Sequence, residues 1–247
     1  MPRFVLDTHT HTIASGHAYS TISEMIAMAQ QKGLKLLAIT EHGPNLEGSV
    51  SEIYFRNFKV IPRQYGDLEL FMGIEADIMD AQGNLCISDN VQQKMDYIVA
   101  SLHPIVTAPM SLEENTSAYI GAMQNPYVCT LGHIDDGKYE IDYEAVVKEA
   151  KKTHTLIELN SSSLHPLASR KNSRENLKTV LALCEREGVP IVIDSDAHIC
   201  YDIANFVRAE ALIDEVHFPE ELIVNTSVEK FKKEIEKKLL YFGVVKR

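Results

Sequence analysis

Short apolar runs, each followed by a loop and then an amphipathic segment, recur along the whole chain. Seven of these runs are rich in β-branched residues and apolar on both faces, as expected of parallel strands buried between helices and a core. They cover residues 4–9, 34–40, 68–76, 97–103, 127–133, 155–160 and 190–196. The pattern therefore predicts seven buried parallel strands.

Segments with helical spacing of apolar residues lie between or after these strands. Thr21 and Glu24 make a capping box at the start of segment 21–32, and Gly33 stands where that helix would end. Segments 142–152, 174–187 and 228–240 have the same spacing. This alternation predicts an α/β fold, and seven units favour a TIM-like barrel that is one unit short of eight. A doubly wound open sheet is the alternative, although no GxGxxG motif follows the first strand.

Length and composition fit one globular domain. The chain has 247 residues, of which 45% are hydrophobic and 24% charged, and no repeat or linker interrupts it. We therefore expect residues 1–247 to form a single domain. No apolar run approaches the roughly 20 residues that span a bilayer, and the start of the chain does not resemble a signal peptide. These features predict a cytoplasmic protein without a membrane partner.

The charge balance and the cysteines exclude other classes of partner and site. Acidic residues outnumber basic ones by 35 to 24, for a net charge of −11. Such a surface repels a phosphate backbone, so extended nucleic acid is not an expected partner. The four cysteines stand far apart without a CxxC pair, which is typical of reduced, buried thiols rather than of a thiolate zinc site.

Histidines gather at the carboxyl ends of the predicted strands. Seven of the ten histidines lie there with two carboxylates: His9, His11, His17, His42, Glu75, His103, His133, Asp196 and His198. The strand ends of a parallel barrel meet at one rim, where active sites are built. His9 and His11 are two residues apart on a strand, so their side chains share a face and can bind one ion together.

Metal binding explains this cluster better than packing does. Seven imidazoles beside two carboxylates would be costly to bury without metal ions. Nitrogen and carboxylate ligands without thiolate suit Zn²⁺, Mn²⁺ or Fe²⁺, and nine ligands suit two or three ions with open positions for water. The other histidines, His154, His165 and His217, fall at a strand start or in loops, so we expect no ligand role for them.

The motifs around these residues resemble the PHP (polymerase and histidinol phosphatase) family over nearly the whole chain. The most specific stretches are DTHTHTIASGHAYSTISE, LLAITEHGP and GIEADI, with S-L-H-P, L-G-H and D-S-D-A-H in support. The resemblance is to the small stand-alone phosphatases of that family. It implies a distorted (β/α)7 barrel, a site with three metal ions, usually zinc, and phosphoesterase activity.

The resemblance also implies how the ligands are shared. One ion would be held by His9, His11, Glu75 and Asp196; Glu75 would bridge to a second ion, held also by His103 and His133; and His17, His42 and His198 would hold the third. Two departures stand beside ligands, namely Glu41 in place of the usual Asp and Asp194 in place of a common Gly. Neither is a ligand position, so they would tune the site rather than abolish it.

We therefore expect a metal-dependent phosphatase that acts on small phosphomonoesters, because a cationic metal pocket on an acidic protein suits a phosphate dianion. The predicted catalytic residues are Glu75, Asp196 and His198, and the predicted nucleophile is a hydroxide held between two ions, in a single in-line displacement. Arg63 matches a position of the family and is predicted to bind substrate. Asn160 and Ser161, just past the sixth strand, are predicted to orient it.

Other functions stay open at this point. An amidohydrolase also begins with HxH on a barrel strand, but its bridging ligand is typically a modified lysine on a later strand. A phosphodiesterase or exonuclease could act on short ends, and a metal-binding module without catalysis would need the same ligands. A small phosphorylated substrate is the expected partner, and we expect a homo-oligomer, with a trimer as the favoured state.

Overall fold

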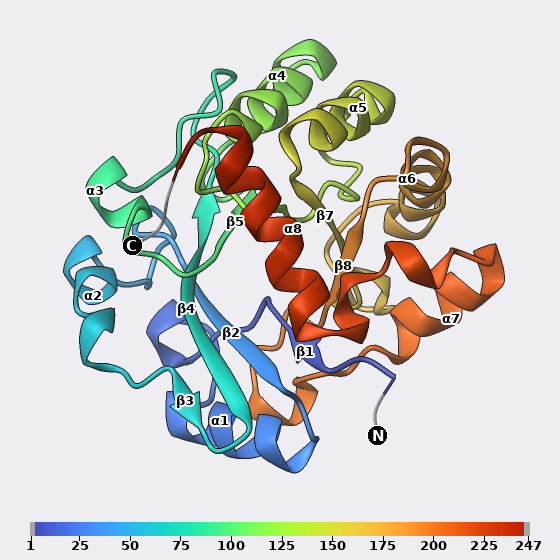
Figure 1. Cartoon of the computed structure of the whole chain (residues 1–247). Helices are drawn as coiled ribbons and strands as arrows, with labels where there is room; N and C mark the ends of the chain where they lie inside the picture. Colours follow the sequence, from blue (N-terminus) through green and yellow to red (C-terminus); the bar gives the residue numbers. More distant parts are fainter. Residues whose placement is uncertain (1–2, 245–247) are drawn as a thin grey trace.

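A parallel sheet rolled into a nearly closed barrel forms the centre of the molecule in the computed structural model, which describes residues 3–244 (Figure 1). Around the ring stand β1 (Leu6–Asp7), β2 (Leu36–His42), β4 (Leu68–Asp77), β5 (Ile98–Ser101), β6 (Thr130–Leu131), β7 (Leu156–Asn160) and β8 (Ile191–Asp194), each parallel to the next. The seven predicted strands and the (β/α)7 barrel are thus confirmed. The short β3 (Gln64–Tyr65), which the sequence pattern did not predict, pairs antiparallel with β4.

The ring closes between β1 and β8 without a regular ladder. At the carboxyl end, Thr10 and Ala197 form a single parallel bridge. Towards the amino end the side chain of Asn225 fills the gap, since its Oδ1 accepts from the Ile193 amide at 2.7 Å and its Nδ2 donates to the carbonyls of Ile193 at 2.7 Å and Leu6 at 3.1 Å. A side-chain amide therefore replaces part of the missing strand pairing.

Helices and short turns connect the strands. The four predicted helices are present as α1 (Ile22–Gln31), α5 (Tyr143–Thr153), α6 (Ser173–Glu187) and α8 (Val228–Tyr241). The capping box of Thr21 and Glu24 is formed as predicted, and Gly188 ends α6 in a left-handed conformation. Four more helices were not predicted: α2 (Glu52–Arg56), α3 (Asp89–Gln92), α4 (Leu112–Met123) and α7 (Val207–Val216). Six single turns of 3₁₀ helix complete the chain: η1 (Ile13–Ser15), η2 (Phe58–Val60), η3 (Ser162–Leu164), η4 (Cys200–Asp202), η5 (Glu220–Leu222) and η6 (Val224–Thr226).

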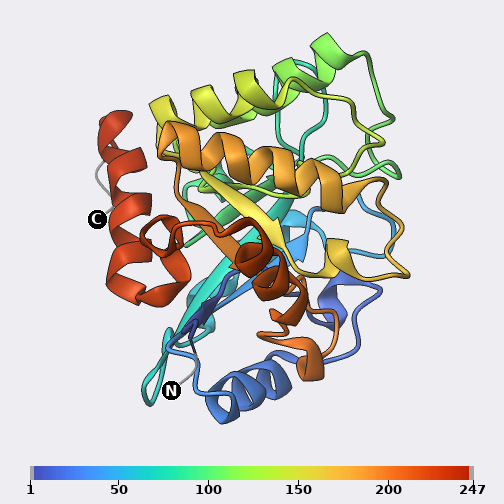
Figure 2. The same ribbon diagram turned by 90° about the vertical axis from the view of Figure 1, so that its right-hand side faces the viewer.

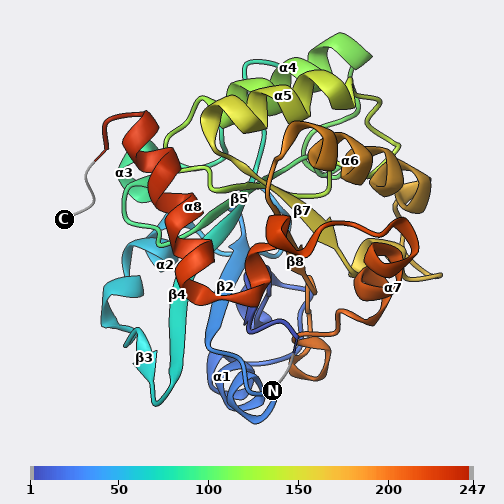
Figure 3. The same cartoon turned by 45° about the vertical axis from the view of Figure 1, so that its right-hand side comes forward.

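Two groups of buried apolar residues hold these layers together. The larger one lies between the sheet and the surrounding helices and includes Leu37, Ile74 and Leu177. The smaller one fills the barrel interior, and Phe231 of α8 is part of it. Helix α8 thereby closes the amino end of the barrel, while the loops that follow the strands surround the opposite end (Figures 2 and 3).

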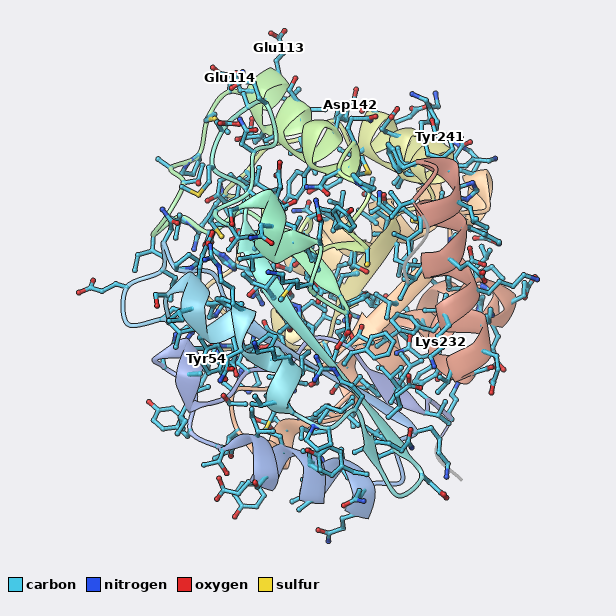
Figure 4. The ribbon with its side chains drawn as sticks, turned by 60° about the vertical axis from the view of Figure 1, so that its left-hand side comes forward. Tyr54, Glu113, Glu114, Asp142, Lys232 and Tyr241 are labelled. Carbon is cyan, nitrogen blue, oxygen red and sulfur yellow. The ribbon has the colours of Figure 1, made fainter. Side chains whose placement is uncertain are left out.

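Helix α8, on which Figure 4 labels Lys232 and Tyr241, carries a buried lysine. Lys238 is only 1% exposed, and its Nζ donates to the Met123 carbonyl at 2.9 Å and to Thr155 Oγ1 at 2.7 Å. Both partners are uncharged, and burial lowers the pKa of Lys238 to about 7. The amino end of the barrel thus contains an ammonium group at an energetic cost.

The domain expected from the sequence covers residues 1–247, but residues 1–2 and 245–247 lie outside the residues that the structure describes. Between residues 3 and 244, no helix is both long and apolar enough to cross a membrane.

Candidate metal centre

All nine predicted ligands lie together at the carboxyl ends of the strands. His9 and His11 follow β1, His17 follows η1, His42 ends β2, Glu75 lies near the end of β4, His103 follows β5, His133 follows β6, and Asp196 and His198 follow β8. Four of them stand two residues beyond the last paired residue of their strand, so several ladders are shorter than predicted. The chain there leaves the sheet, and two of these ligands, His133 and Asp196, have positive φ values of 54°. Left-handed backbone is uncommon for residues other than glycine, although Asp and His adopt it more readily than most, and it tends to occur at functional sites.

Glu75 occupies the middle of the cluster. Its carboxylate is fully buried, and both oxygens face imidazole nitrogens. Oε2 lies 2.9 Å from His42 Nδ1, 3.3 Å from His9 Nε2 and 3.6 Å from His11 Nε2, while Oε1 lies 2.9 Å from His133 Nε2 and 3.2 Å from His103 Nε2. One carboxylate thus faces five histidines, which is the arrangement that a bridging ligand requires.

Asp196 and the remaining two histidines complete the cluster. Asp196 Oδ1 lies 3.4 Å from His11 Nε2 and 3.9 Å from His9 Nε2. His17 and His198 meet at the outer edge, with their Nε2 atoms 3.0 Å apart. Ligand atoms lie within 4.8 Å of one another in four triads, the last of which includes a carboxylate outside the predicted set: His9, His11 and Asp196; His42, Glu75 and His103; His11, His42 and His198; and His9, His133 and Glu158. His42 belongs to two triads, so it lies closer to Glu75 than the predicted sharing of ligands required.

Six buried ligand atoms in this cluster form no hydrogen bond: His9 Nε2, His11 Nε2, His42 Nδ1, Glu75 Oε1 and Oε2, and Asp196 Oδ1. Buried polar atoms in native proteins almost always have a partner, since an unpaired one costs about 1–3 kcal/mol. Their lone pairs converge on the same small volume. Divalent cations are the partners that such a set of nitrogen and carboxylate atoms fits.

The electrostatics of the cluster differ from one ligand to the next. Burial would lower the pKa of His9 and His103, but the carboxylate of Glu75 outweighs it, so the pKa of His9 lies well above its usual value and that of His103 rises to about 10. Burial and the neighbouring imidazoles of His42 and His198 hold the pKa of His11 well below its usual value, so this ring is neutral. Burial alone would raise the pKa of Glu75, but His103 and His9 outweigh it and hold that pKa well below the usual range. Neutral imidazoles and ionised carboxylates are the forms that coordinate a metal ion.

Outer hydrogen bonds fix the orientation of several rings. His9 Nδ1 lies 2.5 Å from Glu158 Oε1, and His103 Nδ1 lies 2.8 Å from Asp77 Oδ1. When a carboxylate accepts from Nδ1, the lone pair of Nε2 is left facing the cluster. Sequence spacing gave no signal for Glu158 or Asp77, because Glu158 lies inside a predicted buried strand and Asp77 directly follows one.

Both departures from the family pattern lie behind ligands. Glu41 accepts a hydrogen bond from Ser15 Oγ at 2.6 Å, and Ser15 Oγ in turn contacts His11 Nδ1 at 3.1 Å. Asp194 accepts hydrogen bonds from the amide and hydroxyl of Thr8 at 2.6 and 2.8 Å. The side chains of Glu41 and Asp194 therefore support the backbone and rings next to the ligands and do not join the cluster.

A cavity of about 540 Å³ opens over the cluster, with His17, His42, His103 and His198 in its wall. Two cationic side chains also line it, Lys138 and Arg170. Arg170 Nη2 lies 3.0 Å from Asp196 Oδ2 and 2.9 Å from His133 Nε2, and its Nη1 donates to Ser163 Oγ at 3.2 Å. The sequence analysis missed Arg170, since nothing in its spacing distinguishes it from other loop arginines.

The three predicted substrate-binding residues lie at different distances from the cluster. Asn160 lies at the cluster, with Nδ2 3.3 Å from both Asp196 Oδ2 and His133 Nδ1. Ser161 lines a neighbouring pocket beside Asp196. Arg63 is not brought to the cluster, because its guanidinium is bonded to Asp96 and to two backbone carbonyls below the rim.

The other three histidines and Cys200 lie outside the cluster. His154 and His217 each end a helix in a left-handed conformation, and His165 follows η3. Cys200 is buried and belongs to the apolar core. A hollow of about 710 Å³, larger than the cavity over the cluster, lies beside Tyr54 on α2 (Figure 4). Its wall is mainly apolar and contains none of the nine ligands, so the larger of the two cavities is not the one at the cluster.

Comparison with known proteins agrees with this geometry. The sequence model of the PHP domain matches residues 7–164, which include seven of the nine clustered groups. The chain belongs to the PHP domain family. Two relatives of this PHP chain are each named a probable phosphatase. The one from Clostridium botulinum is 46% identical over 236 residues, which cover 96% of each chain. The one from Acetivibrio thermocellus is 42% identical over 236 residues, which cover 96% of this chain and 97% of the relative.

Solved structures support the PHP fold. A histidinol phosphate phosphatase from Lactococcus lactis, complexed with zinc, L-histidinol and phosphate, has a TM-score of 0.62 at 18% identity and covers 88% of this chain and 95% of its own. A chain of an archaeal ribonuclease P complex has a TM-score of 0.58 at 18% identity and covers 98% and 95%. At these identities the likeness is one of fold alone, and it extends to proteins of different function.

Proposed function

We propose that this PHP protein is a metal-dependent phosphatase that hydrolyses small phosphomonoesters at the histidine cluster. The observation that carries the proposal is the convergence of buried, unpaired ligand atoms around Glu75. The names of the relatives, which match almost the whole chain, support phosphatase chemistry, and the Lactococcus neighbour was solved with zinc and phosphate. The chain is accordingly an enzyme of the class that hydrolyses phosphoric esters.

The ligand assignment in this proposal is the one that the family resemblance implies. Three zinc ions would be held by His9, His11, Glu75 and Asp196, by Glu75, His103 and His133, and by His17, His42 and His198, and Mn²⁺ or Fe²⁺ are the alternatives. When bound, such ions supply Lewis acidity towards phosphate oxygens and lower the pKa of water.

The chain's own residues would bind and orient the phosphoryl group. Arg170 presents a guanidinium to the cavity, and a planar fork of N–H donors suits phosphate oxygens. Asn160 holds Asp196 and His133 in place through its amide. Glu75, Asp196 and His198 are the residues that we propose as catalytic, with Asn160 and Arg170 on the substrate side.

We further propose direct, in-line attack by water. The Ser15 hydroxyl lies 3.1 Å from His11 Nδ1, but it is fully buried, donates to Glu41 and accepts from the His42 amide at 3.0 Å, so it does not face the cavity. A single turnover in ¹⁸O-water should place one heavy oxygen in the released phosphate, and a chiral thiophosphate ester should show inversion. Retention of configuration, or a trapped phosphoenzyme, would refute this part of the proposal.

The central test combines metal analysis with an activity panel. Gently purified protein should contain two to three equivalents of zinc, manganese or iron and hydrolyse simple phosphomonoesters faster than diesters or amides. A chelator should abolish the activity, and added metal should restore it. Fully active metal-free protein, or a clear preference for amides, would contradict the proposal. The proposed homotrimer is measured separately by light scattering, and the cytoplasmic location by fractionation.

A further inference from the structure

A second pocket adjoins the metal centre at Asp196. Its volume is about 260 Å³, and its wall is formed almost entirely by polar side chains: Ser161, Ser162, His165, Ser195, Asp196, Asp202, Asn205 and Arg208. These residues come from the loop after β7, the loop after β8 and the start of α7. The pocket shares Asp196 with the cavity over the histidine cluster, so the two spaces adjoin at one ligand.

Several polar groups of this wall already have partners. Ser161 Oγ donates to the Asn205 carbonyl at 2.8 Å, and Ser195 Oγ donates to Asp7 Oδ2 at 2.6 Å. Asn205 Nδ2 lies 3.4 Å from Asp202 Oδ1. The first of these bonds joins the loop after β7 to the segment before α7, and the second joins the loop after β8 to β1.

Arg208 is the charged group without a partner. Among the seven arginines of residues 3–244, six form an ion pair with a carboxylate: Arg3, Arg56, Arg63, Arg170, Arg174 and Arg186. Arg208 forms none within that part of the chain, although acidic residues outnumber basic ones by 35 to 24. It is partly buried in the wall of the pocket, where an unpaired guanidinium favours an anion.

Two further donors face the same space. His165 Nδ1 accepts the Leu167 amide at 3.0 Å, so in the neutral ring the proton is on Nε2, which becomes a donor. The hydroxyl of Ser162 has no hydrogen-bond partner among the described residues and is free to donate. Arg208, His165 and Ser162 thus offer three hydrogen-bond donors to the pocket. The carboxylates of the wall, Asp196 and Asp202, already accept hydrogen bonds from other residues.

We infer that this pocket is a subsite for a second anionic group of the substrate, held by Arg208, His165 and Ser162. The inference rests on the proposed phosphatase function and narrows its substrate class. The preferred substrate is a small phosphomonoester whose leaving group carries a carboxylate or another phosphate, placed so that one anion lies at the metal centre and the other in the pocket. A neutral sugar or an amine would leave Arg208 unpaired.

Binding of non-hydrolysable phosphonates to the metal-loaded protein tests the subsite. Three series of equal chain length are titrated by calorimetry: alkylphosphonates, carboxyalkylphosphonates and bisphosphonates, each with two to four methylene groups. At one chain length the wild type should bind a doubly anionic compound at least about tenfold more tightly than the alkylphosphonate, as expected of a charge-assisted hydrogen bond. Comparison of the last two series shows whether the second anion is a carboxylate or a phosphate.

Two variants attribute the difference to the pocket. Arg208→Gln should remove most of the advantage of the second anion, and Ser162→Ala should reduce it. Arg186→Gln is the matched control, because Arg186 lies on the surface and pairs with Glu144 and Glu187. If the wild type shows no advantage at any length, or if Arg208→Gln retains it in full, the subsite is refuted.

Hydrolysis of simple phosphomonoesters is measured on the same preparations. A preparation that hydrolyses no phosphomonoester but shows the Arg208-dependent advantage would refute the phosphatase and leave the anion subsite standing. A preparation that hydrolyses phosphomonoesters but shows no such advantage would refute the anion subsite and leave the phosphatase standing.

Discussion

Replacing Lys238 by methionine should change the way in which stability depends on pH. Lys238 is buried at the amino end of the barrel, where its Nζ donates hydrogen bonds to Met123 and Thr155 and lies 5.2 Å from the centre of the Phe242 ring. Burial lowers its pKa from 10.5 to about 7, while Cys129 and Glu149 oppose the shift. Methionine keeps the length and volume of the side chain without a group that titrates.

The sign and size of the effect follow from proton linkage. Below pH 7 the lysine is charged in both states, and the folded protein carries the whole cost of the buried charge, about 5 kcal/mol for a shift of this size. Above the unfolded pKa the lysine is neutral in both states, and the cost is gone. Between these limits the unfolded chain binds a proton that the folded chain lacks, so stability rises with pH. From about pH 7.5 to about pH 9.5 this gain is about 2.5 kcal/mol.

Urea denaturation of chelated, reduced protein at several pH values measures this gain. The quantity to compare is the free energy of unfolding of the wild type minus that of Lys238→Met, since all other titrating groups cancel. That difference should rise by about 2.5 kcal/mol across the range. Lys237→Met is the control, because Lys237 is only partly buried and is paired with Glu234, and its curve should run parallel to the wild type. A parallel curve for Lys238→Met as well would refute the reasoning, whatever the absolute stabilities.

Other predictions concern the cluster and the core. Glu75→Gln should lower the metal content by more than one equivalent and abolish phosphatase activity, as metal analysis and assay will show, whereas His154→Ala should leave both unchanged. Arg170→Gln should raise KM for a phosphomonoester about tenfold or more, because a charged hydrogen bond to phosphate is worth about 1.5–3 kcal/mol; an unchanged KM would exclude Arg170 from substrate binding. Phe231→Ala should destabilise the protein by about 3–5 kcal/mol, measured by urea denaturation, because it leaves a cavity where a fully buried aromatic ring packs inside the barrel.

Hydrophobic patterning predicted the barrel strands well because those strands are buried on both faces and leave long apolar runs. The helices that the hydrophobic pattern did not predict lack an apolar first turn, a side-chain cap or sufficient length. Helix α4 begins with a capping box of Ser111 and Glu114, but its first turns are polar, and Figure 4 shows Glu113 and Glu114 at its outer end. Helix α7 begins at Phe206 without a side-chain cap, and α2 and α3 are too short to show a period.

The ligand cluster was predictable because strand ends of a parallel barrel meet at one rim, so chain position alone brings the histidines together. Side chains that act through loop geometry were not predictable in this way. Arg63 and Arg170 are both loop arginines, and only the fold shows that the first is bonded to Asp96 and the second faces the cavity. The partners Glu158 and Asp77 likewise depend on strand register, which the sequence leaves open.

Closure of the barrel by Asn225 has a consequence for how the protein is made. During synthesis the amino-terminal strand, which carries His9 and His11, emerges first, but its place beside β8 is completed by a residue near the other end of the chain. Contacts of such long sequence separation form late in folding. Most of the polypeptide must therefore be synthesised before the ring can close, so His9 and His11 can meet Asp196 and His198 in the closed barrel only after residue 225 has been made.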